Sequence, residues 1–160
     1  MSPVELRAFA GRFPTGVAVI TARDRAGRCF GGTVNALMSV SLEPPLFLVS
    51  LGHGSKTLAA IVESGCLCIN LLSDRQTEVS RVFASKDSDK FRAVAYTIGA
   101  SGPLIDGAVA QAECQVQATY EGGDHTMIVA RVVRTEQHDA DPLVYHRGAF
   151  TALAERQQAG

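Results

Sequence analysis

A dense run of small polar residues lies between a glycine pair, Gly31 and Gly32, and a proline pair, Pro44 and Pro45. Glycines in a strand let another group approach the backbone closely. Small hydroxyl and amide side chains at a strand end suit a site that hydrogen-bonds the edge of a flat polar ligand. The same composition is typical of a turn rich in serine and asparagine, so both interpretations stay open at this point.

The sequence Ser55-Lys56-Thr57 precedes a predicted helix and could hold a phosphate group. The start of a helix offers free backbone N–H groups and the positive end of the helix dipole, to which this sequence adds two hydroxyls and an ammonium. The alternative is that Ser55 only caps the helix and Lys56 is solvated. Neither a G-x-x-x-x-G-K-[ST] nor a G-x-G-x-x-G motif occurs, which excludes the usual nucleotide-binding loops.

His125 follows a second glycine pair, Gly122 and Gly123, on a predicted turn. There its ring could reach a ligand and donate a proton or a hydrogen bond. The alternative is a histidine that faces solvent.

The remaining polar groups argue against other chemistries. Asp87, Asp89 and Lys90 precede Phe91, and their charge alone favours a solvated loop. There is no nucleophile elbow and no pair of carboxylates framed by apolar residues, so hydrolase chemistry has little support. The cysteines include no C-x-x-C pair and have no clustered histidines near them, so we expect no metal site. A disulfide framework is also not expected in a domain of this size from a reducing compartment. They are Cys29, Cys66, Cys68 and Cys114.

Composition narrows the class of protein further. A chain of 160 residues predicts a single domain over 1–160. Fifteen Lys+Arg against sixteen Asp+Glu give a net charge of −1 without a basic block, so nucleic acid and membrane surfaces are not expected partners. No apolar run approaches the ~20 residues that cross a bilayer, and the first residues do not resemble a secretory signal, so we expect a cytoplasmic protein. Charged residues are only 19% of the chain, which predicts surface buried between subunits.

Capping residues predict where the helices begin. Ser2 and Glu5 form a capping box with a proline at the first helical position, and Ser73 and Gln76 form a second box. Ser55 can cap a third helix that Gly65 ends. The predicted helices cover about 3–12, 56–63 and 74–84.

The rest of the chain reads mainly as strands. Apolar residues occupy the even positions from Ala110 to Tyr120, which is typical of a half-buried strand, and the glycine turn should pair it with 126–135. The interval 85–107 reads as loop. Many short strands with few helices predict a mostly β fold, a closed or nearly closed antiparallel barrel. The other predicted strands are 16–22, 28–36, 45–51, 66–72, 143–146 and 149–153.

In this order and spacing the residues resemble the flavin reductase family over about 5–153. The resemblance rests on F-P-T-G-V-A-V-I-T (13–21), G-x-T-x-N-A-x-x-S-V-S-L-E-P-P-L (31–46), Ser55 to Thr57, N-L-L-S (70–73), F-A with D-K-F (83–91), D-G-A-x-A-x-x-E-C (106–114), G-D-H (123–125) and L-V-Y (143–145). It implies the FMN-binding split β-barrel, an antiparallel and Greek-key-like fold.

The resemblance also implies site residues. One set would contact FMN or FAD. Within this set, the serines and the lysine would hold the ribityl chain and the phosphate of the flavin. This set is Thr33, Asn35, Ala36, Ser39, Val40, Ser41, Ser50, Leu51, Ser55, Lys56, Thr57, Phe83, Ala84 and Phe91. His125, as the catalytic residue, and Tyr145 would lie near the nicotinamide of NADH or NADPH.

The activity that the resemblance implies is NAD(P)H-dependent reduction of FMN or FAD. Hydride would pass to flavin N5 in a homodimer that supplies reduced flavin to a partner monooxygenase. This needs no strong acid or base, because the protein mainly orients the two rings. Two alternatives share the barrel: a flavin- or haem-binding protein without turnover, and an oxidase of the pyridoxamine phosphate type.

Overall fold

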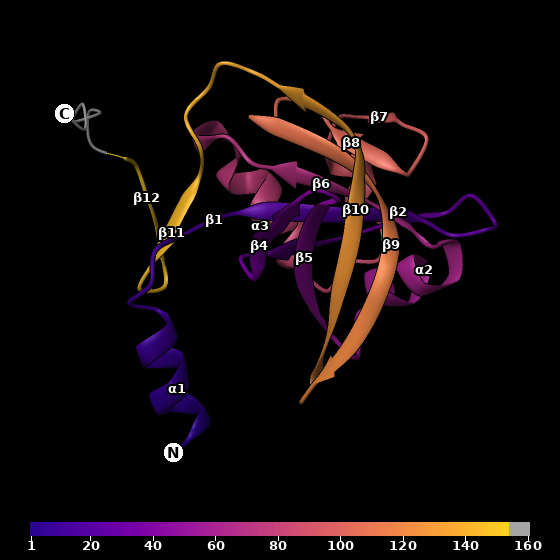
Figure 1. Ribbon diagram of the computed structural model, residues 1–160. Coiled ribbons are helices and arrows are strands. Elements are labelled where there is room, and N and C mark those ends of the chain that lie inside the picture. Colours follow the sequence, from indigo (N-terminus) through magenta and orange to yellow (C-terminus); the bar gives the residue numbers. More distant parts are fainter. Residues whose placement is uncertain (154–160) are drawn as a thin grey trace.

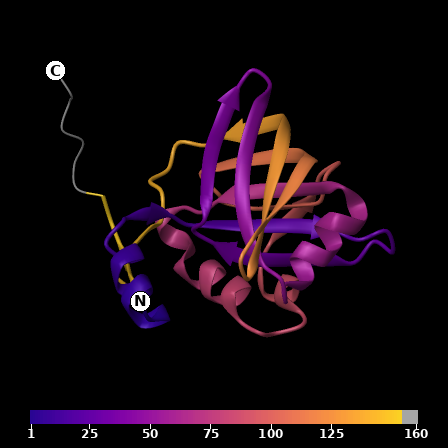
Figure 2. The same cartoon turned by 60° about the horizontal axis from the view of Figure 1, so that its bottom comes forward.

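A computed structural model describes residues 1–153, and its centre is an antiparallel sheet of seven strands (Figure 1). The strands lie in the order β3-β2-β6-β9-β10-β5-β4. The edge strands β3 and β4 follow each other in the chain through the link 35–36, so the sheet curls back on itself and stays split between them (Figure 2). The seven strands are β2 Ala18–Arg23, β3 Cys29–Val34, β4 Leu37–Leu42, β5 Pro45–Gly52, β6 Cys66–Leu71, β9 Ala110–Gly122 and β10 His125–Gln137.

Smaller elements surround this sheet. Strands β1, β11 and β12 form a second sheet, and β7 pairs with β8. The short strands are β1 Thr15–Gly16, β7 Tyr96–Ile98, β8 Pro103–Ile105, β11 Val144–His146 and β12 Ala149–Thr151. The helices are α1 Pro3–Ala10, α2 Lys56–Ser64 and α3 Thr77–Ala84, with 3-10 turns η1 Asp74–Gln76 and η2 Lys90–Ala93. The prediction of a mostly β, antiparallel protein with a few helices is confirmed.

Strand β2 is buried on both faces and separates two apolar cores. Side chains alternate across a strand, so Ile20 faces the barrel interior while Val19 faces the layer of α3 and β8. The interior core is closed by α2, which inserts Leu58 and Ile61. The outer core is built around Phe83 of α3, which is 1% exposed.

The predicted helix starts are confirmed. Ser2 and Glu5 make both bonds of a capping box. Ser55 accepts a hydrogen bond from Leu58 N, and Gly65 ends α2 in the left-handed conformation at φ +71°. The predicted helix over 74–84 begins as the 3-10 turn η1 before it becomes α3.

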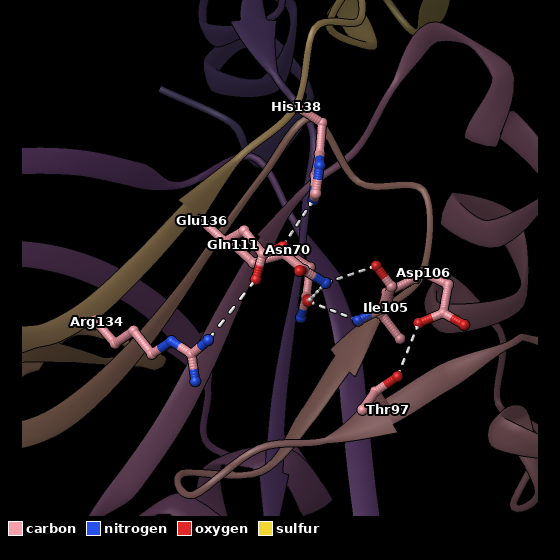
Figure 3. Close-up of polar contacts among 8 residues, drawn as sticks. All are labelled: Asn70, Thr97, Ile105, Asp106, Gln111, Arg134, Glu136 and His138. Carbon is pink, nitrogen blue, oxygen red and sulfur yellow. Dashed lines mark hydrogen bonds and ion pairs between the residues drawn. The ribbon is translucent and has the colours of Figure 1, made fainter.

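The interval 85–107 contains more structure than predicted, because the β7–β8 hairpin lies within it. The hairpin is held by the fully buried Asn70 of β6 (Figure 3). Its Oδ1 accepts from Ile105 N at 2.8 Å, and its Nδ2 donates to Val19 O at 3.0 Å. Gln111 Nε2 donates to Ile105 O at 2.7 Å. The hairpin depends on this network because its strands have three residues each.

The long hairpin of β9 and β10 has the predicted partners, with His125 opposite Gly122. Tyr120, an even position expected on the buried face, is 56% exposed, and Glu113 departs from the alternation in the opposite sense. Glu113, an odd position expected on the polar face, is 3% exposed and accepts from Ser101 N at 2.7 Å. The loop that enters β8 therefore covers this part of the polar face.

Strand β4 was not predicted, since its sequence suggested part of a serine-rich turn. It pairs with β5 from Leu37 to Leu42 and leaves apolar side chains in solvent. Leu42 is 94% exposed and Met38 is 58% exposed. Helix α1 stands apart from the barrel and has no buried residue (Figure 1). No helix within residues 1–153 has the length and apolar character needed to cross a membrane.

Candidate functional site

A cleft of about 690 Å³ opens beside the split in the sheet. One side is formed by β3 and the link 35–36, where Ala36 O accepts from Ser50 N of β5 at 3.0 Å. The opposite side is formed by the start of α2 and by the segment from Phe83 to Phe91. The volume of the cleft lies within the range of small-molecule sites, roughly 300–1,000 Å³.

One end of the cleft is suited to an anion. Lys56 and Thr57 are the first two residues of α2, and within residues 1–153 their backbone N–H groups have no hydrogen-bond acceptor. Ser55, Lys56 and Thr57 all line the cleft. The helix dipole, the free N–H groups and the ammonium together favour a phosphate here.

Gly31 and Gly32 of β3 both line the cleft. A Cβ on Gly31 would lie 2.5 Å from Cε1 of Phe83, so only glycine lets that ring pack against the strand. Phe83 and Phe91 pack edge to face with centroids 5.0 Å apart, and Thr33 Oγ1 donates to Ser80 O at 2.7 Å and joins β3 to α3. A Cβ on Gly32 would lie 3.6 Å from Thr57 Oγ1, so the missing side chain there leaves room between β3 and the start of α2.

The charges that line the cleft are mainly positive, from Lys56, Lys86 and Lys90, with Asp87 among them. Burial lowers the pKa of Lys90, the charge of Lys56 lowers it further, and Asp87 opposes both. The expectation of a solvated loop here is therefore wrong for Lys90, which is partly buried and donates to two backbone carbonyls. Burial also raises the pKa of the Cys29 thiol at the edge of the cleft.

The turn between β9 and β10 brings His125 to the cleft. Its Nδ1 lies 2.7 Å from Asp124 Oδ1, and this hydrogen bond lowers the pKa of the Asp124 carboxyl. His53, on the neighbouring loop, pairs instead with Glu121 at 3.0 Å. Of these two histidines, His125 is the one whose ring contributes to the cleft lining.

The structure brings most of the predicted site residues together in this cleft. They come from five separate stretches of chain, which only the fold places side by side. They are Thr33, Asn35, Ala36, Ser50, Leu51, Ser55, Lys56, Thr57, Phe83, Ala84, Phe91 and His125.

Four predicted residues are not brought to the cleft. Ser39, Val40 and Ser41 belong to β4, which follows the link 35–36. This strand pairs with the edge of β5 that is not paired with β10. Tyr145 lies in a second hollow of about 590 Å³ against α1, with Arg147. Asn35 lines both hollows, so the two are neighbours.

Some lining residues were not predicted. Gly52 ends β5 and Gly54 lies between β5 and α2, where glycine is typical of a turn and carries no other signal. The segment 85–88 has no pattern of apolar residues that could have marked it. Among residues 1–153, no three His, Cys, Asp or Glu side chains gather in a way that could hold a metal ion.

Comparison with known proteins agrees with this geometry. The model of the flavin reductase like domain matches residues 10–154. A curated relative called "Probable flavin reductase", from Rhizobium meliloti (strain 1021), is 41% identical over 149 residues, which are 92% of this chain. The chain spans 48% of that relative's length.

Two further proteins match over more of their length. The reductase subunit HsaB of a flavin-dependent monooxygenase, from Rhodococcus jostii (strain RHA1), is 34% identical over 96% of this chain and 79% of its own. The solved structure of the NADH:FAD oxidoreductase SgcE6 from Streptomyces globisporus C-1027, in complex with NAD and FAD fragments, has a TM-score of 0.90 at 34% identity. That match covers 95% of this chain and 93% of the other. The chain therefore belongs to the flavin reductase-like domain family.

Proposed function

We propose that this chain is an NAD(P)H-dependent reductase of FMN or FAD. The observation that carries the proposal is one cleft in which a helix start suited to an anion lies beside the open place at Gly32 of β3. Family membership supports the same activity.

The residues present fit a flavin phosphate and ring. The free N–H groups of Lys56 and Thr57 and the Ser55 hydroxyl would hold the phosphate. The absence of a side chain at Gly32, whose Cβ would lie 3.6 Å from Thr57 Oγ1, would let the ring lie along β3. A bound flavin supplies the acceptor for hydride, and the protein has to hold the two rings in contact and exclude water.

The nucleotide side of the site is assigned to His125, which would donate a hydrogen bond from the rigid end of β10. Asp124 would keep its ring oriented through the 2.7 Å contact to Nδ1. The flavin contacts of Ser39, Val40 and Ser41, and the nicotinamide contact of Tyr145, remain predictions. The proposal leaves open FMN or FAD and NADH or NADPH.

We further propose that the chain works as a homodimer and passes reduced flavin to a monooxygenase, as the name of the relative HsaB suggests. Apolar side chains on β4 and α1 are exposed in the single chain, among them Leu42 and Phe9, at 94% and 77%. A second copy that covered them would remove this apolar surface from water.

The test is a steady-state assay that crosses NADH and NADPH with FMN and FAD. We expect nucleotide oxidation with at least one pair. Tight flavin binding without nucleotide oxidation would favour the carrier alternative, and oxygen uptake with pyridoxamine phosphate would favour the oxidase. No nucleotide consumption with any flavin contradicts the proposal.

A further inference from the structure

The outer wall of the cleft, residues 84–90, has little regular structure of its own. Its local hydrogen bonds stay within the segment and the end of α3. Ser85 Oγ donates to Val82 O at 2.8 Å, Asp87 N donates to Ser85 Oγ at 3.2 Å, and Asp89 N donates to Asp87 Oδ1 at 3.0 Å. These bonds shape the segment but do not fix its distance from β3.

Lys90 makes the connection to β3. Its Nζ donates to Phe83 O at 2.8 Å and to Gly31 O at 3.2 Å. Phe83 lies in the last turn of α3, where carbonyls lack helical partners and a cation is favoured. Gly31 lies on the edge strand β3, whose outward carbonyls have no neighbouring strand. One ammonium therefore satisfies two carbonyls that belong to opposite sides of the cleft.

The position of this bridge matters because it joins β3 to the two aromatic rings of the outer wall. The Phe83 ring lies where a Gly31 side chain would be, and Phe91 packs against it from the residue after Lys90. Loss of the bridge would let the segment 84–91 move away from β3. The cleft along β3, where a flat ring would lie, would then widen.

We propose that Lys90 is a positioning residue that fastens the outer wall of the cleft to β3 and thereby sets the affinity for flavin. This inference rests on the proposed function for the identity of the ligand. The bridge itself is a property of the protein without ligand, so it can be measured separately.

The test compares wild type with Lys90→Met, which keeps the length of the side chain but removes the donors. Amide hydrogen exchange in the protein without ligand should become faster in 84–91 and stay unchanged in β6. The Kd for FMN, from flavin fluorescence, should rise by about tenfold, as expected for the loss of hydrogen bonds from a charged group. The KM for FMN should rise by a similar factor, and the KM for the nucleotide should stay at its wild-type value.

Two variants serve as controls. Arg92→Met removes a positive charge from the same 3-10 turn at an exposed position outside the cleft lining, so exchange and FMN affinity should match wild type. Lys90→Arg keeps a cation with several donors and should restore FMN affinity to within about threefold. An arginine variant as weak as the methionine variant would contradict the proposal.

The proposal is overturned if Lys90→Met binds FMN like wild type and its segment 84–91 exchanges at the wild-type rate. Should that variant fail to fold, Lys90→Gln, which keeps one amide donor group, decides by the same two measurements. If wild type binds no flavin, the proposed function fails, whereas exchange in the unliganded protein still decides whether Lys90 fastens the wall.

Discussion

His125 contributes an imidazole to the cleft from a rigid strand end, and its removal isolates the nucleotide side of the site. If the ring donates one hydrogen bond to the nucleotide, His125→Ala should lower kcat/KM for the nucleotide by about threefold to tenfold, since one such bond contributes roughly 0.5–1.5 kcal/mol. The Kd for flavin should hardly change, because the proposed phosphate contacts are at the start of α2. Steady-state kinetics and a flavin titration give the two quantities.

His53→Ala is the matched control, since His53 pairs with Glu121 outside the cleft lining. It should leave both quantities at their wild-type values. A His125→Ala variant that loses flavin while its nucleotide KM holds would place His125 on the flavin side.

Asp24 provides a pH-dependent contribution to stability in the turn between β2 and β3. Burial raises the pKa of its carboxyl, but hydrogen bonds from the backbone and side chain of Arg28, at 2.8 and 2.7 Å, outweigh burial and leave the pKa below its ordinary value. A carboxyl whose pKa is lowered in the folded state stabilises the protein at pH values above its pKa in the unfolded state, about 3.9. This contribution is lost as the pH falls through the pKa of the folded state.

We therefore expect Asp24→Asn to have a lower free energy of unfolding than wild type at neutral pH. The difference should shrink as the pH falls below about 3.9. Urea unfolding of both proteins across this interval measures it. A difference that stays constant, or grows in acid, would show that the carboxylate charge is not responsible.

Asn70 joins β2, β6 and β8 through one buried amide. Figure 3 shows its contact with Ile105 of β8. Asn70→Ala should lower the free energy of unfolding by about 3 kcal/mol, because Ile105 N loses its acceptor and a buried unsatisfied group costs roughly 1–3 kcal/mol. Gln117→Ala, an exposed position on β9, should change it by less than about 0.5 kcal/mol. Equal effects in the two variants would contradict this role for Asn70.

Local signals in the sequence predicted the elements that depend on local chemistry. The capping residues Ser2, Ser55 and Ser73 marked the helix starts, and the alternation in β9 marked its pairing with β10. Strand β7 and strand β8 carried no such signal, because three residues are too few for a period and tertiary hydrogen bonds from Asn70 hold them. Strand β4 alternates from Met38 to Leu42, but its serines and the prolines that follow are also typical of a turn.

Most residues of the cleft lining could be predicted only from the resemblance. The helix chemistry of Ser55 to Thr57 independently indicated an anion site. The wall formed by 85–88 could not be predicted, since its place beside β3 depends on the bonds of Lys90 across 59 residues of chain. The spacing of residues in the sequence also could not show that Ser39 and Ser41 of β4 are not among the residues that line the cleft.

We expect the protein to be a homodimer, because apolar side chains of β4 and α1 are exposed in the single chain. Sedimentation at micromolar concentration should give twice the 16.9 kDa of one chain. Leu42→Glu should shift the mass toward the monomer without changing the fold, because the side chain is 94% exposed in one chain and would be buried only between copies.

The single domain predicted over 1–160 includes 154–160, which lie outside the described residues.

Val62→Glu is the control for this experiment, since Val62 is also apolar and exposed, at 65%, but lies on α2. It should sediment like wild type. A 17 kDa species for the wild-type protein would count against the dimer, as would equal dissociation in both variants.

We propose that hydride passes to a flavin in the cleft between β3 and α2. Anaerobic mixing of NADH, FMN and protein, with nucleotide and flavin absorbance followed together, tests this transfer. Wild type should reduce one flavin for each nucleotide oxidised. Gly32→Val, whose Cβ would lie 3.6 Å from Thr57 Oγ1 and whose methyl groups would enter the cleft, should slow this at least about tenfold. Gly16→Val, with no atom within 4 Å of its Cβ, should react like wild type. Reduction by Gly32→Val at the wild-type rate would contradict the claim.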